Sequence, residues 1–290
     1  GTAWCFSAKE AAGQFEYLFV DEAGQVSVAN LVGMARAAKN IILLGDQMQL
    51  GQPMQGAHPG ESGLSVLDYL LEGSAVIGRD RGIFLDRTWR LHPDLCRFVS
   101  GAFYEGRLLP RPGTEANTIK VPSGKAGRVP VEAGLLFIPV AHDGNSQASA
   151  EEVEAIKGIV SDLVGREFKA VGGKRSGRLT LDDILFVAPY NMQVNAIRKA
   201  IPGAKVGSVD KFQGLEAPVV IVSMCASQGE ISTRGIEFLF SKNRLNVAVS
   251  RAQCLAIVVG SPGLARSRCG SLEQVALANT FCRLVREGTR

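Results

Sequence analysis

Short apolar runs alternate with helical repeats of apolar residues along most of this chain. Seven runs of three to five residues, many of them β-branched, are typical of strands buried on both faces. They occupy residues 17–20, 41–44, 83–85, 135–138, 184–187, 219–222 and 255–259. Apolar residues at helical spacing follow at 91–102, 153–163 and 272–284. Strands that alternate with helices favour an α/β fold, in which helices flank a parallel sheet.

The length and the charge distribution both indicate two domains. At roughly 150 residues per domain, 290 residues correspond to about two. Residues 1–76 carry a net charge of −5, whereas the rest of the chain carries +9. We place the boundary near Arg79, so that the predicted domains are residues 1–79 and 80–290. Turn-rich residues 51–63 and the Gly, Lys and Arg-rich residues 171–178 are predicted to be loops.

The basic part of the chain permits a polyanionic partner such as nucleic acid. Residues 79–128 contain ten basic side chains against five acidic ones, and residues 165–180 add five against one. Solvated loop charge is the simpler explanation, and charge alone favours it. A nucleic acid partner therefore needs support from motifs.

The remaining composition excludes several classes of protein. With 46% hydrophobic and 21% charged residues, the chain is typical of a folded soluble protein. No apolar stretch approaches the roughly 20 residues that span a bilayer, so no membrane partner is expected. The six cysteines never form C-x-x-C, and the three histidines never stand at metal-ligand spacing. Buried, reduced thiols are therefore expected, which suits a cytoplasmic protein.

Two carboxylates follow the first predicted strand directly. Residues 17–20 are apolar, and Asp21 and Glu22 come next. A carboxylate at the end of a parallel strand can hold Mg²⁺ through water, and an adjacent Glu can polarise the water that attacks a γ-phosphate. The alternative is that the two acids only favour the start of a helix at Val26.

The second predicted strand also ends in polar residues. Gly45, Asp46, Gln47, Met48 and Gln49 follow it, and both strand ends should lie at the edge of the sheet where α/β proteins bind ligands. A glutamine there can donate to a terminal phosphate and accept from its attacking water, and Gln49 is the candidate. A polar turn without function is the alternative.

Six segments in order resemble the signatures of superfamily 1 helicases, in particular the 1B branch that includes the nonsense-mediated-decay helicase. They are DEAGQ (21–25), GDQMQL (45–50), TWRLHP (88–93), APYNMQ (188–193), SVDKFQGLE (208–216) and LNVAVSRA (245–252). The resemblance covers nearly the whole chain. It implies a P-loop NTPase helicase core with RecA-like sheets. Residues 1–79 would be the remnant of domain 1 with motifs II and III, and residues 80–290 would be domain 2 with motifs IV to VI.

The resemblance also assigns roles in ATP hydrolysis. Arg90 and Arg251 match the arginines that neutralise charge on the γ-phosphoryl group, and each could instead pair with a local acid. Trp89 would stack on the adenine or merely pack. Glu216 matches a glutamate near the nucleotide. Gly214 would permit close backbone approach or form a turn. The implied cofactors are ATP and Mg²⁺, with Asp21, Gln25 and Gln49 at the nucleotide and Glu22 activating water.

The implied partner is single-stranded nucleic acid, with DNA slightly favoured over RNA. In this family the contacts go to the backbone and to stacked bases. Tyr190, Gln193, Ser208 and Val209 match positions along the strand, although Tyr190 could be a packed strand cap. The alternative class is a non-catalytic nucleic acid binding module, which would not need Glu22, Arg90 and Arg251 together.

One family signature is missing. The phosphate-binding G-x-x-x-x-G-K-[ST] does not occur, because Gly124-Lys125 and Gly173-Lys174 lack the rest of the pattern. We therefore expect a C-terminal portion of a 5′ to 3′ helicase whose partner is the missing N-terminal part of the parent chain. Alone it should turn over little ATP. GTAWCFSAKE and HPGESGLS resemble bacterial chains with an added nuclease-like half, but no nuclease carboxylate cluster is visible.

Overall fold

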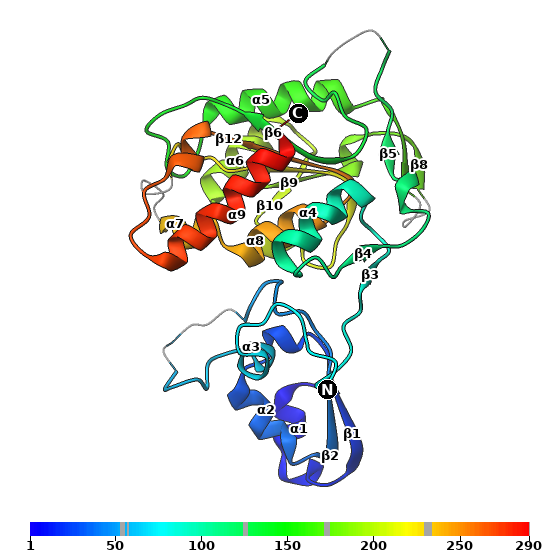
Figure 1. The fold of residues 1–290 in the computed structure, drawn as a ribbon, viewed down its shortest axis with the longest axis vertical. Helices are drawn as coiled ribbons and strands as arrows, with labels where there is room; N and C mark the ends of the chain where they lie inside the picture. Colours follow the sequence, from blue (N-terminus) through cyan, green and yellow to red (C-terminus); the bar gives the residue numbers. More distant parts are fainter. Residues whose placement is uncertain (53–55, 57, 124–126, 171–174, 229–233, 290) are drawn as a thin grey trace. The chain divides into compact units, whose positions relative to one another are not determined.

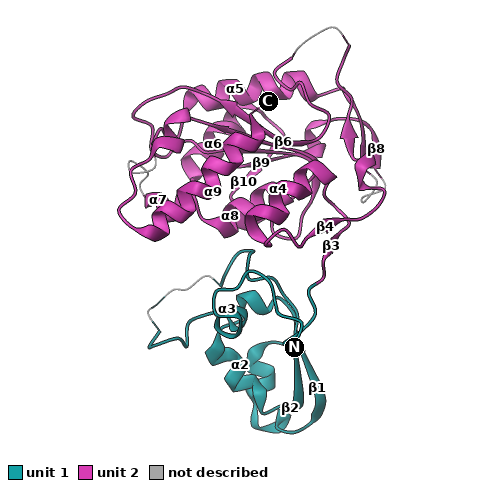
Figure 2. Cartoon of the chain, viewed as in Figure 1, with its two compact units in different colours: residues 1–84 teal, residues 85–290 magenta. Residues whose placement is uncertain are grey.

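Two compact units, residues 1–84 and 85–290, make up the chain in this computed structural model (Figure 2). The structure describes residues 1–52, 56, 58–123, 127–170, 175–228 and 234–289. Each unit has a hydrophobic core of its own. The division lies a few residues after Arg79, where the sequence places the boundary.

The first unit is built on a parallel pair of strands. Strand β1 (Phe15–Val20) pairs with β2 (Ala38–Leu43), with Val20 opposite Leu43. Leu18 and Val20 are buried, whereas the alternate residues Tyr17 and Phe19 are 55% and 63% exposed. The other elements are α1 (Ala3–Ser7), the 3₁₀ turns Lys9–Ala11 and Ala23–Gln25, α2 (Val28–Ala35) and α3 (Val66–Leu71). The core of this unit therefore lies on one face of the pair.

A five-stranded parallel sheet forms the centre of the second unit, in the order β10-β9-β11-β12-β6. Its strands are β6 (Gly134–Pro139), β9 (Ile184–Val187), β10 (Lys205–Gly207), β11 (Ala217–Ser223) and β12 (Ala252–Gly260). All residues of β9, β11 and β12 are buried. This parallel sheet confirms the predicted α/β class. Its strands are uninterrupted apolar runs because a sheet covered on both faces buries every residue of its strands.

Helices cover both faces of this sheet (Figure 1). Helices α5 (Ala150–Leu163) and α6 (Asn191–Ala200) lie on one face, and their apolar residues share a core with the strands. The other face carries α4 (Pro93–Phe103), α8 (Lys242–Ser250) and α9 (Leu272–Gly288), and α7 (Gly235–Leu239) packs beside α9. On that face the rings of Phe240 and Phe281 stack with centroids 4.8 Å apart. Ser149 and Ser271 cap α5 and α9 through their hydroxyls.

Small sheets and 3₁₀ turns complete the second unit. Strands β3 (Arg87–Thr88) and β4 (Leu109–Pro110) pair in parallel, whereas β5 (Thr118–Ile119), β7 (Glu167–Ala170) and β8 (Arg175–Arg178) form an antiparallel sheet. The 3₁₀ turns span Thr114–Ala116, Leu181–Asp183, Val209–Phe212 and Pro262–Arg266.

Two sequence predictions about these elements are wrong. Residues 83–85 form no strand, and Ile83 and Leu85 are 87% and 80% exposed, because this short run has no neighbouring strand. Residues 175–178 of the predicted loop form β8, which pairs with β7 through its backbone. Residues 171–174, and residues 53–55 and 57 of the other predicted loop, lie outside the described part of the chain.

The cysteines are all unpaired, but only half of them are buried. Cys96, Cys225 and Cys254 are buried, Cys269 and Cys282 are partly exposed, and Cys5 is exposed. Burial raises the pKa of Cys96 to about 11 and that of Cys254 to about 12. The prediction of buried thiols is therefore wrong for Cys5. Among the helices described, none is long and apolar enough to cross a membrane.

Candidate nucleotide and nucleic acid sites

The carboxyl ends of β1 and β2 bring the two polar segments of the first unit together. Asp21 and Glu22 follow β1 directly, and the N–H of Ala23 donates to the carbonyl of Leu44 at 2.8 Å. The segments approach so closely that a Cβ on Gly45 would lie 2.8 Å from the nitrogen of Ala23. The predicted juxtaposition of both strand ends is therefore present in this unit.

Glu22 has an unusual backbone conformation. Its φ of 51° and ψ of 42° lie in the left-handed region, which costs a non-glycine residue on the order of 1 kcal/mol or more. The N–H of Glu22 donates to Oδ1 of Asp21 at 2.9 Å, and Nε2 of Gln25 donates to Oε2 of Glu22 at 3.4 Å. Strain of this kind concentrates at functional sites. The three side chains therefore form one polar cluster at the end of β1.

The helix-start alternative for the two acids is wrong. Residues Ala23–Gln25 form a 3₁₀ turn, and the next helix, α2, begins at Val28. Its cap is Ser27, whose hydroxyl accepts from the N–H of Asn30. Both acids are exposed and precede that cap, so they are not needed to start the helix.

The loop after β2 is fixed by its own side chains. Asp46 accepts from the N–H of Met48 and from Nε2 of Gln49, both at 2.9 Å. Nε2 of Gln47 donates to the carbonyls of Ser74 and Ala75 at 2.9 and 2.8 Å. Gln49 is thus held by the carboxylate of its own turn, beside the strand end that carries Asp21.

In the second unit, Arg90 and Glu216 form an ion pair. Nε of Arg90 lies 2.6 Å from Oε2 of Glu216, and one of its terminal nitrogens donates to the carbonyl of Ser250. Oε1 of Glu216 accepts from Gln253 at 2.9 Å. In this structure Arg90 is therefore paired with an acid, which is the alternative to its contact with the γ-phosphoryl group. Its partner is itself a predicted nucleotide residue from a distant segment.

Arg251 is more deeply placed than a residue of an open cleft. We expect both arginines to face a solvent-filled cleft, but Arg251 is only 4% exposed. It stands between the end of α8 and the wholly buried strand β12, and its carbonyl accepts from the N–H of Ala217 at the start of β11. This position at the sheet explains its burial.

The structure places Trp89 at the surface and Gly214 in a turn. Trp89 is 61% exposed, with the guanidinium carbon of Arg111 3.3 Å from its ring centroid, so it is not a core residue. Gly214 has a φ of +79°, and a Cβ there would meet nothing within 4 Å. The glycine therefore provides the backbone freedom that this turn requires, and the described protein atoms leave the space beside its Cα open.

Two of the four predicted nucleic acid residues line a pocket. Tyr190 and Ser208 follow the carboxyl ends of β9 and β10 and contribute to a cavity of about 350 Å³. Arg234, Phe238 and Arg244 also line it, and the rings of Tyr190 and Phe238 are 5.5 Å apart. These three residues are absent from the sequence-based site. Their signal was basic and aromatic residues interleaved between positions 234 and 244.

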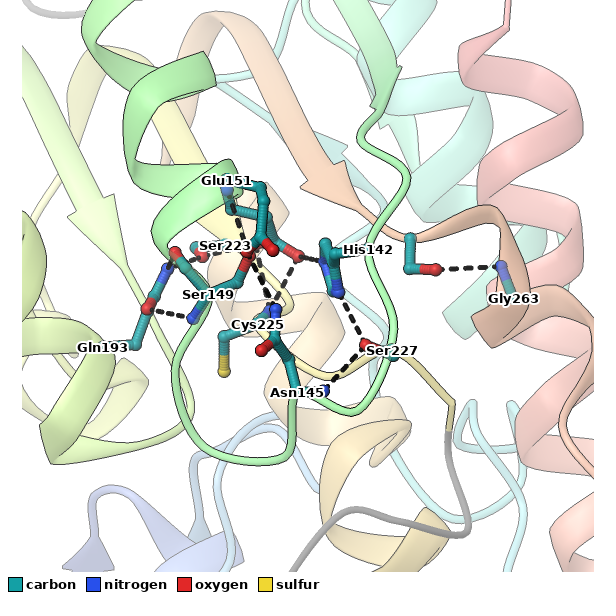
Figure 3. Close-up of polar contacts among 11 residues, drawn as sticks. His142, Asn145, Ser149, Glu151, Gln193, Ser223, Cys225, Ser227 and Gly263 are labelled. Atoms are coloured by element: carbon teal, nitrogen blue, oxygen red, sulfur yellow. Dashed lines mark hydrogen bonds and ion pairs between the residues drawn. The ribbon is translucent and has the colours of Figure 1, made fainter.

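Gln193 and Val209 do not reach the surface. Val209 is 6% exposed and Gln193 is fully buried. The side-chain oxygen of Gln193 accepts from the N–H of Ser149 at 2.9 Å, and its nitrogen donates to Oγ of Ser223 at 2.8 Å (Figure 3). Because internal partners satisfy both ends of this amide, the predicted side-chain contact with nucleic acid is wrong in this structure.

Glu152 is the centre of the same buried network. Its carboxylate contacts Oγ of Ser223, the backbone N–H of Cys225 and Nε2 of His142, the last at 3.0 Å. Nδ1 of His142 lies 2.7 Å from Oγ of Ser227. The network joins the loop after β6, the start of α5 and the end of β11. No local sequence pattern reveals it, because its members are far apart in the chain.

Comparison with known proteins adds a family and several relatives. Residues 65–263 match a family model described as an AAA domain. The DNA-binding protein SMUBP-2 of Rattus norvegicus is 31% identical over 253 residues, which cover 82% of this chain and 24% of that protein. The RNA helicase Mov10l1 of Homo sapiens is 30% identical over 302 residues, which cover 92% and 24%. The chain thus spans about a quarter of the length of these curated relatives.

A solved structure is also similar. It is the Arterivirus nonstructural protein 10 (helicase) in complex with DNA, which is 15% identical to this chain. The match covers 84% of this chain and 39% of that one, with a TM-score of 0.42.

Proposed function

Because the chain belongs to the AAA-domain family, as a RecA-like domain of the superfamily 1B helicases, we propose that the protein is an ATP-dependent nucleic acid helicase or translocase. The observation that carries the proposal is the cluster at the ends of β1 and β2. It joins Asp21, the strained Glu22 and Gln25 to the loop of Gln49.

The donor set at this cluster suits Mg²⁺ that is bound together with a nucleotide. Mg²⁺ keeps several waters and needs only one or two protein carboxylates when phosphates supply other oxygens. Asp21 offers an exposed carboxylate of this kind, and the described residues contain no group of three or more acidic, His or Cys ligands. When bound, the ion would neutralise charge on the phosphates. Asp21 would hold its water shell, and Glu22 would orient and activate the attacking water.

Residues of the second unit would act on the same nucleotide. Arg90 and Arg251 would stabilise negative charge on the γ-phosphoryl oxygens. Glu216 would hold Arg90 in position until the phosphate replaces it, since carboxylate and phosphate are both acceptors for a guanidinium. Trp89, exposed beside Arg111, would stack on the adenine.

The nucleic acid along which the protein moves would be a single strand, and the protein would hold it through its backbone. Tyr190 and Ser208 at the pocket support this part of the proposal. The relatives' names include both a DNA-binding protein and an RNA helicase, so they favour neither sugar. Phosphate contacts and stacking are common to both.

Efficient ATP turnover would require a phosphate-binding loop in addition to these residues. The 290 residues contain no G-x-x-x-x-G-K-[ST], and oriented phosphate contacts contribute several kcal/mol to transition-state stabilisation. We therefore expect negligible turnover from these residues alone, with the loop supplied by an N-terminal segment of the same protein. A nuclease activity is not part of this proposal.

Strand-stimulated ATPase measurements on the full-length protein test the proposal. ATP turnover should rise when single-stranded homopolymers are added, and Glu22→Gln should abolish the rise. A panel of DNA and RNA homopolymers would assign the sugar. If the protein binds the strand without any stimulated ATP turnover, the proposed helicase or translocase activity is overturned. That result would favour the alternative, a non-catalytic binding module.

A further inference from the structure

The pocket beyond β9 and β10 is built around one aromatic ring. The guanidinium carbons of Arg234 and Arg244 lie over the ring of Phe238, 3.9 and 4.5 Å from its centroid. A planar guanidinium held on an aromatic face loses little further freedom when it binds a ligand, because its orientation is already set. Phe238 therefore holds both cations at the pocket.

The charge of the pocket suits one singly charged anion. Asp210 pairs with Arg244 at 3.2 Å and so offsets that cation. Arg234 forms no ion pair with a carboxylate in the part of the chain that the structure describes. Four neutral polar side chains complete the polar lining, namely Gln147, Tyr190, Asn191 and Ser208. Among the described residues, the pocket therefore has one arginine without a carboxylate partner, and this charge with the hydrogen-bond donors around it suits one phosphodiester group.

The location favours a phosphate of a strand. The pocket lies at the carboxyl ends of β9 and β10, beside Tyr190, and it is lined by residues from four segments of the chain. Carboxyl ends of parallel strands are where α/β proteins bind ligands. The buried Glu152 network fixes the loops that carry Gln147 and Tyr190, since Ser149 and Gln193 belong to it.

We propose that Arg234, Phe238 and Arg244 form a clamp that holds one phosphodiester of the bound single strand. This inference rests on the proposed function and adds to it three binding residues that lie outside the six family signatures. Arg234 makes the ion contact, Phe238 orients it, and the paired Arg244 adds a directed donor. The clamp reads no base, because its donors meet the backbone.

Salt titrations of strand affinity test the clamp. In the purified protein, Arg234→Ala should weaken binding of a single-stranded homopolymer about tenfold, as expected for one charge-assisted hydrogen bond. The slope of log affinity against log salt should become shallower by about 0.7, the value for one contact on a single strand. Phe238→Leu should also weaken binding while leaving the charge in place. Arg286→Ala removes an exposed arginine from α9, which packs beside β6 at the other edge of the sheet, and should change neither quantity.

The possible outcomes separate the clamp from the proposed function. Wild-type protein that binds no strand would overturn both. Wild-type binding with Arg234→Ala and Phe238→Leu unchanged in affinity and slope, in variants with a normal melting temperature, would overturn the clamp alone. Inorganic phosphate is the probe for a free-anion site. If millimolar phosphate binds the wild type but not Arg234→Ala, without competing with the strand, the pocket is a free phosphate site and the clamp is wrong.

Discussion

Arg90 and Glu216 come from segments more than a hundred residues apart, yet Nε of the arginine lies 2.6 Å from Oε2 of the glutamate. Both side chains are partly exposed, at 29% and 38%, so solvent weakens this pair and it contributes little to stability. The ion pair matters because it fixes the position of the Arg90 side chain. The glutamate holds the planar fork of a guanidinium, to which the proposed function assigns contact with the γ-phosphoryl oxygens.

The first prediction separates the arginine from its partner. Arg90→Ala should lower strand-stimulated ATP turnover by about 10³ or more, the range of an arginine finger. Glu216→Gln keeps an acceptor but removes the charge, so it should lower turnover by only about tenfold. The double variant should be no worse than Arg90→Ala, because both changes affect one unit. Fully additive losses, measured beside unchanged melting temperatures, would show that the two residues act separately.

Arg251 should behave differently, because it is buried. Arg251→Ala should reduce both turnover and the free energy of unfolding, the latter by about 2–4 kcal/mol as expected for a buried polar residue. Thermal melting of Arg251→Ala and Arg90→Ala side by side tests this contrast, since only the former should melt several degrees earlier. Normal turnover by folded Arg251→Ala would remove this arginine from the mechanism.

Most of the second unit could be predicted from the sequence, for a physical reason. Strands such as 184–187 and 255–259 are apolar throughout because helices cover both faces of the sheet, and that pattern is local. The run 83–85 has the same composition, but no strand lies beside it. Conversely, β8 is made of Arg, Ser, Gly and Arg, and it exists through backbone pairing with β7, which composition does not encode.

The candidate sites also contain residues that the sequence predicts and residues that it does not. Asp21 and Glu22 were predictable because their chemistry follows directly from a strand end. The motif that contains Gln193 predicts a contact with nucleic acid, yet the side chain is buried because its partners Ser149 and Ser223 lie 44 and 30 residues away in the chain. Arg234 and Phe238 were missed because only the folded chain brings them beside Tyr190.

Replacement of Gln193 should affect stability. Gln193→Leu leaves the N–H of Ser149 without its side-chain acceptor in a buried place, and an unsatisfied group of this kind costs about 1–3 kcal/mol. Met192→Ala is the control, because that neighbouring residue of α6 is 58% exposed and should change the free energy of unfolding little. Urea titrations measure both. A Gln193→Leu variant of wild-type stability that loses strand affinity would restore the surface role.

The thiols should react in an order set by burial. A raised pKa means less thiolate, so at pH 8 the thiols of Cys96 and Cys254, with pKa values of about 11 and 12, are almost entirely protonated as well as shielded. Exposed Cys5 should therefore label first with a thiol reagent, and Cys96 and Cys254 only after denaturation. Mass spectrometry of labelled peptides gives the order. Cys5→Ser should remove the fast phase, and rapid native labelling of Cys96 would contradict its burial.

The left-handed backbone of Glu22 allows function and stability to be tested at one residue. Glu22 and Glu72 both have a φ of 51°, and Glu72 ends α3, where glycine is the usual residue. Glycine at either position relieves the backbone strain but adds freedom to the unfolded chain, so the free energy of unfolding should stay level or rise by up to about 1 kcal/mol. Only Glu22→Gly should also abolish strand-stimulated ATP turnover, as Glu22→Gln should, because it removes the carboxylate that activates water.

Denaturant titrations and ATPase assays on the three variants provide the comparison. Turnover retained by Glu22→Gly would exclude the proposed role of this carboxylate, whereas equal losses of turnover in Glu22→Gly and Glu72→Gly would assign the effect to the fold of the first unit.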